Sequence, residues 1–326
     1  DNVSYIGDRA FIEVGGYINQ NLKTDKSDYM IILRGQVNYI GASAFYSSWF
    51  DIGFSSTFSF AEINGVKPTI YSSAFGSGGS TSYGKHKIVG VDGLETLVLD
   101  DVDMYQRVFS GAIIDVNMKF INCNFNISES GYMGNTFSGS TLNGNLDIIY
   151  TSGEAQDIGL RNYTLRDLNV NGDVTIDYKN FNGMLYERLM QNFSCNTLTI
   201  KGVSVLRNGI FGTEKNNYAN RGPRSIVFDN SCTFTALGEG ALNNCDNLIS
   251  IVLPGSITSI DFLAFANITM KDGEIILTSA LSNLQTVVIN NGTSVVSVNG
   301  DLLINDTVIK FKVPSSIING YANDAN

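Results

Sequence analysis

Alternating hydrophobic and polar positions mark five short segments of the chain as strands. The segments read LETLVLDDV (94–102), NTLTIKGV (196–203), RSIVFDN (224–230), NLISIVLP (247–254) and NLQTVVIN (283–290). A period of two residues places neighbouring side chains on opposite faces, which is the pattern of a half-buried β-strand. Turn residues follow three of them: Lys201-Gly202, Pro254-Gly255 and Asn290-Asn291-Gly292.

A second pattern, nine residues long, recurs along the chain. In the clear copies its fourth position is aliphatic, its ninth is aromatic or Leu, and its first is hydrophobic except at Lys67. Clear copies begin at residues 3, 37, 67, 203, 234, 257 and 295, and weaker copies at 101, 129, 155 and 178. The clear copies and the strand at 247–254 supply a predicted core of Ile6, Phe11, Ile40, Phe45, Ile70, Phe75, Leu206, Phe211, Leu237, Leu242, Leu248, Ile251, Leu253, Ile260 and Phe265. The weaker copies place Met104 and Phe109, Tyr132 and Phe137, Ile158 and Tyr163, and Phe181 and Tyr186 at the fourth and ninth positions.

This repetition predicts a solenoid. Successive copies start 23 to 38 residues apart, a spacing typical of stacked repeats. One unit of strand, turn, short strand and loop cannot cover its own apolar face, but stacking aligns the inward side chains into columns. We expect the aromatic side chain of each unit to stack on that of the next. The fold class predicted is mainly β with short helical turns.

The units at both ends of the chain resemble the BspA-like leucine-rich repeat family. The resemblance rests on CDNLISIVLPGSITSIDFLAF (245–265), YIGDRAF (5–11), YIGASAF (39–45) and CNTLTI (195–200), and it covers 1–75 and 195–303. It implies a curved leucine-rich-repeat solenoid of about ten irregular repeats over 1–310, with degenerate repeats over 76–194. The segment 311–326 is similar to the tail that often follows such arrays and is expected to be a C-terminal cap. The resemblance implies adhesion or recognition, and it brings no catalytic residues.

Composition and charge narrow the functional classes. The chain has 326 residues with a net charge of −10, which argues against nucleic acid as a partner because phosphate binding needs clustered Lys and Arg. No apolar run reaches the roughly 18 residues of a membrane span. The chain shows no signal peptide and does not begin with Met, so we expect a mature product or a fragment of a longer protein. Cys123, Cys195, Cys232 and Cys245 form no CxxC motif and are expected to be buried free thiols.

The motifs that suggest chemistry are weak. His86 is the single histidine, no GxSxG accompanies it, and a loop histidine is expected. The acidic LDDVD (99–103) lacks the spacing of an EF-hand and is favoured as a solvated turn over a Ca²⁺ site. The Gly-rich FGSGGSTSYG (75–84) is not a P-loop and is expected to be a flexible loop. We therefore expect no enzyme, no cofactor and no metal, although a carboxylate pair across neighbouring coils stays possible in such a fold.

One aromatic segment is a candidate contact surface. YSSWFDIGFSSTFSF (46–60) combines rigid aromatic rings with small polar residues, as binding loops do. The candidate contacts are Tyr46, Trp49, Phe50, Phe54 and Phe58. The alternative is that this segment packs on its own coil or forms a subunit contact.

Three functions follow as hypotheses. The first is a secreted or cell-surface adhesin that binds a host or neighbouring-cell protein or glycan through an extended surface. The second is a phage tail or baseplate component located on the virion, structural or receptor-binding, with homo-oligomeric assembly. The third is a polysaccharide-active solenoid enzyme, for which no residue pair stands out.

Overall fold

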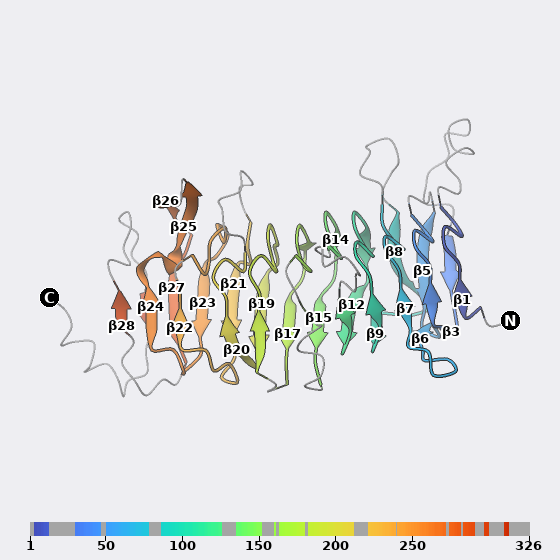
Figure 1. The fold of residues 1–326 in the computed structure, drawn as a ribbon, viewed down its shortest axis with the longest axis horizontal. Helices are drawn as coiled ribbons and strands as arrows, with labels where there is room; N and C mark the ends of the chain where they lie inside the picture. The colour runs from blue at the N-terminus through green and yellow to red at the C-terminus, as the bar shows by residue number, and fades with distance from the viewer. Residues whose placement is uncertain are drawn as a thin grey trace. The chain divides into compact units, whose positions relative to one another are not determined.

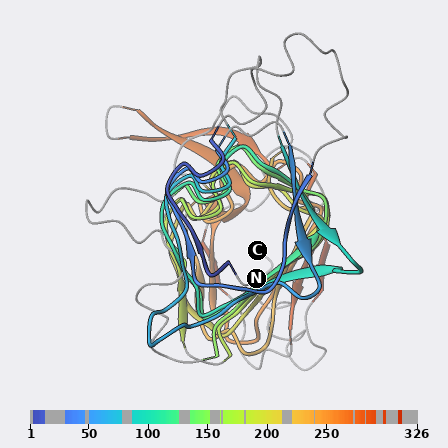
Figure 2. The same ribbon diagram turned by 90° about the vertical axis from the view of Figure 1, so that its right-hand side faces the viewer.

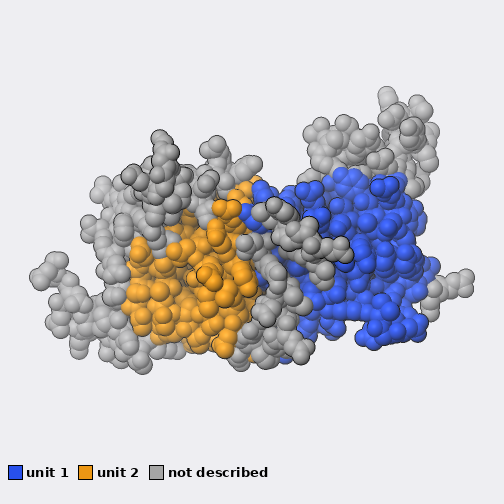
Figure 3. Space-filling model, viewed as in Figure 1, with its two compact units in different colours: residues 1–172 blue, residues 173–326 orange. Residues whose placement is uncertain are grey.

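The computed structural model describes residues 3–12, 30–46, 50–77, 86–125, 135–151, 160, 163–179, 182–211, 221–238, 240–271, 274–281, 283–290, 297–299 and 310–312. The chain divides into two compact units, residues 1–172 and 173–326 (Figure 3). Both are built mainly from short parallel strands, so the prediction of a β repeat architecture is confirmed. Helical turns are scarcer than expected: in the described ranges the only helix is the 3-10 helix η3 (Phe262–Phe265).

Unit 1 holds three rows of parallel strands, to each of which successive coils contribute (Figure 1). The β1 row contains β1 (Tyr5–Ile6), β4 (Tyr39–Ile40), β7 (Thr69–Ile70), β10 (Asp103–Met104) and β13 (Asn124–Phe125). The β2 row contains β2 (Met30–Leu33), β5 (Asp51–Ser55), β8 (Lys87–Val91), β11 (Ile113–Asp115), β14 (Thr141–Leu142) and β16 (Asn169–Val170). The third row contains β9 (Thr96–Asp100), β12 (Asn117–Ile121) and β15 (Leu146–Ile149). A separate parallel pair joins β3 (Gln36–Val37) and β6 (Ser59–Phe60).

Unit 2 repeats the plan. Its longest row contains β17 (Val174–Asp177), β19 (Thr197–Lys201), β21 (Ser225–Phe228), β23 (Ser250–Leu253), β27 (Thr286–Ile289) and β29 (Lys310–Lys312). Shorter rows pair β18 (Gly183–Leu185) with β20 (Val203–Leu206), and β22 (Ala236–Leu237) with β24 (Ser259–Asp261) and β28 (Ser297–Asn299). β25 (Ala266–Lys271) and β26 (Glu274–Ala280) form an antiparallel hairpin. The five strands predicted from alternation are all present, as β9, β19, β21, β23 and β27.

The fourth position of the nine-residue phrase forms buried columns. In unit 1, Ile6 pairs with Ile40, Ile40 with Ile70 and Ile70 with Met104, always in parallel register. In unit 2, Leu237 pairs with Ile260. Each of these side chains is at most 6% exposed. Within each unit the backbones of successive coils lie over one another (Figure 2). The aliphatic position recurs because every coil presents the same contact to the coil before it.

The ninth position forms a phenylalanine stack in unit 1. Centroid distances are 5.2 Å from Phe11 to Phe45, 5.4 Å from Phe45 to Phe75, 5.5 Å from Phe75 to Phe109 and 5.3 Å from Phe109 to Phe137. All four pairs are close to parallel, with at most 13° between ring planes. Offset stacking of this kind adds favourable energy beyond burial of the rings.

The turns before Phe11, Phe45, Phe75 and Phe109 each have a left-handed residue. Arg9, Ser43, Ser73 and Arg107 have φ between 55° and 59°. The turn then aligns its backbone with the next coil, since the Ser43 amide donates to the Ser72 carbonyl at 3.0 Å and the Phe45 amide donates to Ala74 at 2.8 Å. These hydrogen bonds hold neighbouring turns in the same geometry. A non-glycine residue tolerates positive φ only at a cost, which the repeated bonding offsets.

In two of the weaker copies, a residue outside the predicted fourth position pairs at the aliphatic position of the row. Phe125 in β13 pairs with Met104, and Leu185 in β18 pairs with Leu206. The predicted ninth-position residue Phe137 does lie in the phenylalanine stack. Tyr132, Ile158 and Phe181 themselves lie outside the described residues, as does most of the expected cap, 313–326.

Candidate recognition surfaces

His86 lies outside the strands, directly before β8, as expected of a loop histidine, and its side chain is buried. It is 2% exposed, and its Nε2 lies 2.9 Å from the carbonyl oxygen of Phe75. Because a carbonyl only accepts, Nε2 carries the proton of the neutral ring. Burial lowers the pKa of His86 to about 4, against a weaker opposing effect of the hydrogen bond to Phe75. The Gly-rich segment 78–85 before it lies outside the described residues.

Lys67 forms ion pairs with the acidic turn at 99–103. The Nζ of Lys67 lies 2.8 Å from Asp101 and 2.7 Å from Asp103. Desolvation lowers the pKa of Lys67, but the two carboxylates outweigh this effect and the net pKa is raised. A side-chain cation therefore neutralises these oxygens. Across the part of the chain that the structure describes, no group of three or more His, Cys, Asp and Glu side chains is arranged to hold a metal ion.

The aromatic segment 46–60 lies largely in the interior. Phe50, Phe54 and Phe58 are 7%, 0% and 8% exposed. Phe54 packs edge-on against Phe58, with 4.7 Å between the centroids of the rings. The burial of these three rings favours the alternative that the segment packs on its own coil. Tyr46 is half-buried, and Trp49 lies outside the described residues.

A different aromatic surface crosses four coils of unit 1. Tyr5 stacks on Tyr39 at 4.2 Å between ring centroids, Tyr39 contacts Tyr71 at 5.0 Å, and Tyr71 stacks on Tyr105 at 4.5 Å. Tyr5 is 59% exposed, and the other three rings are half-buried. We call this set the tyrosine row. It follows the β1 row, with each of its side chains at least partly exposed.

The row changes position between the second and third coils. Tyr5 and Tyr39 precede the buried aliphatic residue of their strands, whereas Tyr71 and Tyr105 follow it. In the first two coils glycine stands at that following position. A Cβ on Gly41 would collide with Asp8.

Asp8 fills the space that Gly41 leaves. Its Oδ1 accepts hydrogen bonds from the Ala42 amide at 2.8 Å and from the Tyr39 hydroxyl at 3.3 Å. Burial raises the pKa of Tyr39, and the neighbours Tyr5 and Asp8 add to the shift. In the sequence the tyrosines of this row appear as YIG, IYS and MYQ, each beside the buried aliphatic residue. The nine-residue phrase does not reveal them, because the tyrosine precedes that residue in YIG and follows it in IYS and MYQ.

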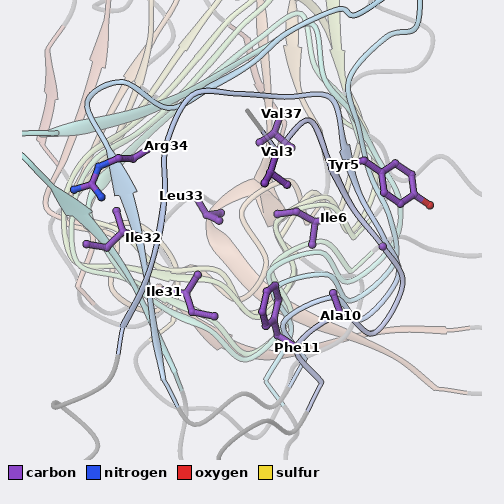
Figure 4. A pocket seen from close by; sticks show the side chains of 11 residues that line it. Val3, Tyr5, Ile6, Ala10, Phe11, Ile31, Ile32, Leu33, Arg34 and Val37 are labelled. Carbon is purple, nitrogen blue, oxygen red and sulfur yellow. The ribbon is translucent and has the colours of Figure 1, made fainter. Parts of the chain in front are cut away.

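The first coil of unit 1 ends in an open apolar hollow. A cavity of about 400 Å³ lies there, with Ile6, Phe11, Ile31 and Leu33 around it (Figure 4). Val3 is 58% and Ile32 39% exposed at this end. The equivalent positions of the second coil are closed by the first. This end of the stack therefore presents a coil surface that has no neighbouring coil among the described residues.

The four cysteines are buried free thiols, as expected, and burial raises the pKa of Cys123 to about 12 and of Cys232 to about 11. No helix in the described ranges has the length and apolarity needed to cross a membrane. Comparison of the chain with protein-family models, with curated proteins and with solved structures finds no match.

Proposed function

We propose that this chain is a non-enzymatic recognition protein of the BspA-like leucine-rich-repeat type, secreted or on a cell surface. In this proposal it binds a host or neighbouring-cell protein or glycan through the outside of its stacked coils. The observation that carries the proposal is the tyrosine row, with Tyr5 59% exposed. Tyrosine is enriched at binding surfaces because its rigid ring covers much area and its hydroxyl bonds to polar groups.

Two further features support the proposal. The segment 245–265, whose sequence carries the resemblance, folds as the strand β23, the short strand β24 and the 3-10 helix η3, which is compatible with a strand-turn-short strand repeat unit. The one histidine is buried beside the Phe75 carbonyl, and the acidic turn is paired with Lys67, so neither is poised for catalysis. Within each unit, parallel strands of successive coils pair in register, so equivalent side chains of neighbouring coils lie side by side on the outer surface.

The test is binding of the full chain to arrayed glycans and to extracellular-matrix proteins. The variant Tyr39→Ala removes the ring at the centre of the tyrosine row, and Tyr186→Ala makes the same change elsewhere. We expect Tyr39→Ala to weaken binding to the best probe by about tenfold or more, as for a hot-spot residue, and Tyr186→Ala to leave it unchanged. Circular dichroism checks that both fold. Equal binding by both variants and the wild type would contradict the proposal.

The open hollow at the first coil favours a second candidate, a phage tail or baseplate component that assembles through this end. Exposed apolar surface of this kind is often a contact site, and this candidate assigns the contact to another copy of the chain. The measurement is the mass of the protein in solution by light scattering. A trimer or larger ring that dissociates on Ile32→Asp supports assembly. A monomer of 35.4 kDa at high concentration argues against this candidate and for the first.

A further inference from the structure

A polar groove crosses three successive coils of unit 2. It has a volume of about 360 Å³ and is lined by Arg224, Asn247, Ile249, Asn283 and Gln285. Arg224, Ile249 and Gln285 each stand directly before a strand, β21, β23 and β27 respectively, at equivalent positions of the parallel ladder. Asn247 and Asn283 lie two residues earlier in their coils. The repeat therefore aligns these residues in two neighbouring lines, one with Arg224, Ile249 and Gln285 and one with Asn247 and Asn283.

Hydrogen bonds between neighbouring coils hold the residues of the groove in place. The Ile249 amide donates to the Arg224 carbonyl at 2.8 Å, and the Gln285 amide donates to the Ile249 carbonyl at 2.9 Å. The Asn283 Nδ2 donates to the backbone carbonyl of Asp246 at 2.6 Å, which orients that amide. The floor of the groove is thus fixed before any ligand arrives, and little ordering cost is left for binding.

The charge of the groove differs from that of the chain. The protein carries a net charge of −10, yet no acidic side chain lines this groove. The Arg224 side chain is exposed and forms no ion pair with any residue that the structure describes. Arginine presents a planar fork of donors that matches a carboxylate bidentately. Amide side chains beside it both donate and accept, as sugar hydroxyls require.

We propose that this groove binds a saccharide that carries a carboxylate, with Arg224 on the carboxylate and Asn247, Asn283 and Gln285 on the hydroxyl groups. A protein partner is disfavoured because protein interfaces place an apolar core at their centre, and Ile249 is the single apolar residue of the lining. This inference rests on the proposed recognition function, because it names a ligand class for that function. Its site is separate from the tyrosine row.

The test is calorimetric titration of the full chain with sialyllactose, with lactose as the neutral counterpart and sulfated lactose as the other anion. We expect sialyllactose to bind, lactose to bind much more weakly, and added salt to weaken the binding. Arg224→Ala should lower the affinity for sialyllactose by about tenfold or more. Arg224→Lys should restore part of it, because lysine keeps the charge but not the fork. Arg207→Ala, an exposed arginine outside the groove, is the matched control and should have no effect.

The outcomes separate this inference from the proposed function. Unchanged affinity in Arg224→Ala, or no binding of sialyllactose by the wild type, overturns the groove proposal. If Tyr39→Ala still weakens binding to the arrayed probes in that case, the recognition function stands. A preference for sulfated lactose over sialyllactose overturns the carboxylate assignment. If both Tyr39→Ala and Arg224→Ala bind the arrayed probes as well as the wild type does, both proposals are contradicted.

Discussion

Lowering the pH from 7 to 5 is expected to reduce the free energy of unfolding by about 2 kcal/mol, because the imidazole of His86 is held neutral in the folded chain. The folded pKa is about 4 against 6.5 for an ordinary histidine. The unfolded chain therefore binds a proton first as the pH falls. The contribution of the neutral His86 to the free energy of unfolding is therefore present above pH 6.5 and is lost as the pH falls toward 4.

The structural reason is the environment of both ring nitrogens. Nε2 donates to the Phe75 carbonyl, while Nδ1 is buried without a hydrogen-bond partner among the described residues. A proton added to Nδ1 would therefore have no acceptor there, and the charge would have lost its hydration. The carboxylates with shifted pKa, Asp92 and Asp229, are lowered from 3.8, so their effects fall below this pH range.

Two measurements check this reasoning. Since the chain has one histidine, its ring-proton NMR signal reports the pKa directly. Urea denaturation followed by circular dichroism, at pH 7, 6 and 5, gives the loss of stability. The matched variant is His86→Gln, whose amide can still donate to Phe75 but does not titrate in this range. A wild-type pKa near 6.5, or the same pH dependence in the wild type and His86→Gln, would refute the reasoning.

Three further predictions concern the packing of the coils. Ser43→Gly should stabilise the chain by about 0.5–1 kcal/mol in urea denaturation because glycine tolerates its positive φ, whereas Ser72→Gly, where φ is not positive, should destabilise it. Gly183→Ala should cost about 1–3 kcal/mol, because a Cβ would collide with the buried ring of Tyr178, and an unchanged melting temperature would contradict this. The four thiols should react with a disulfide reagent at the rate of unfolding, and rapid reaction of the native protein would show that they are accessible.

The sequence by itself determined the strands and the columns inside the coils. Alternation identified β9, β19, β21, β23 and β27, and the nine-residue phrase identified the positions of Ile40 and Phe45. These features are local, since a strand pattern spans only a few residues and the same aliphatic position recurs in each coil. They can also be read from the sequence because burial of apolar side chains is the dominant favourable term in folding each unit.

Only the tertiary structure decided which side chains meet between coils. Lys67 forms ion pairs with Asp101 and Asp103 of the neighbouring coil, and Tyr39 contacts Tyr71 of the neighbouring coil. The two residues of each pair are more than thirty positions apart in the sequence. No local pattern encodes these contacts, because each depends on the lengths of the loops between the strands. The same reason explains why other residues take the aliphatic position in two of the weaker repeats. Whether a polar or aromatic residue was buried, paired or exposed was set by its neighbour in the next coil, not by its neighbours in the chain.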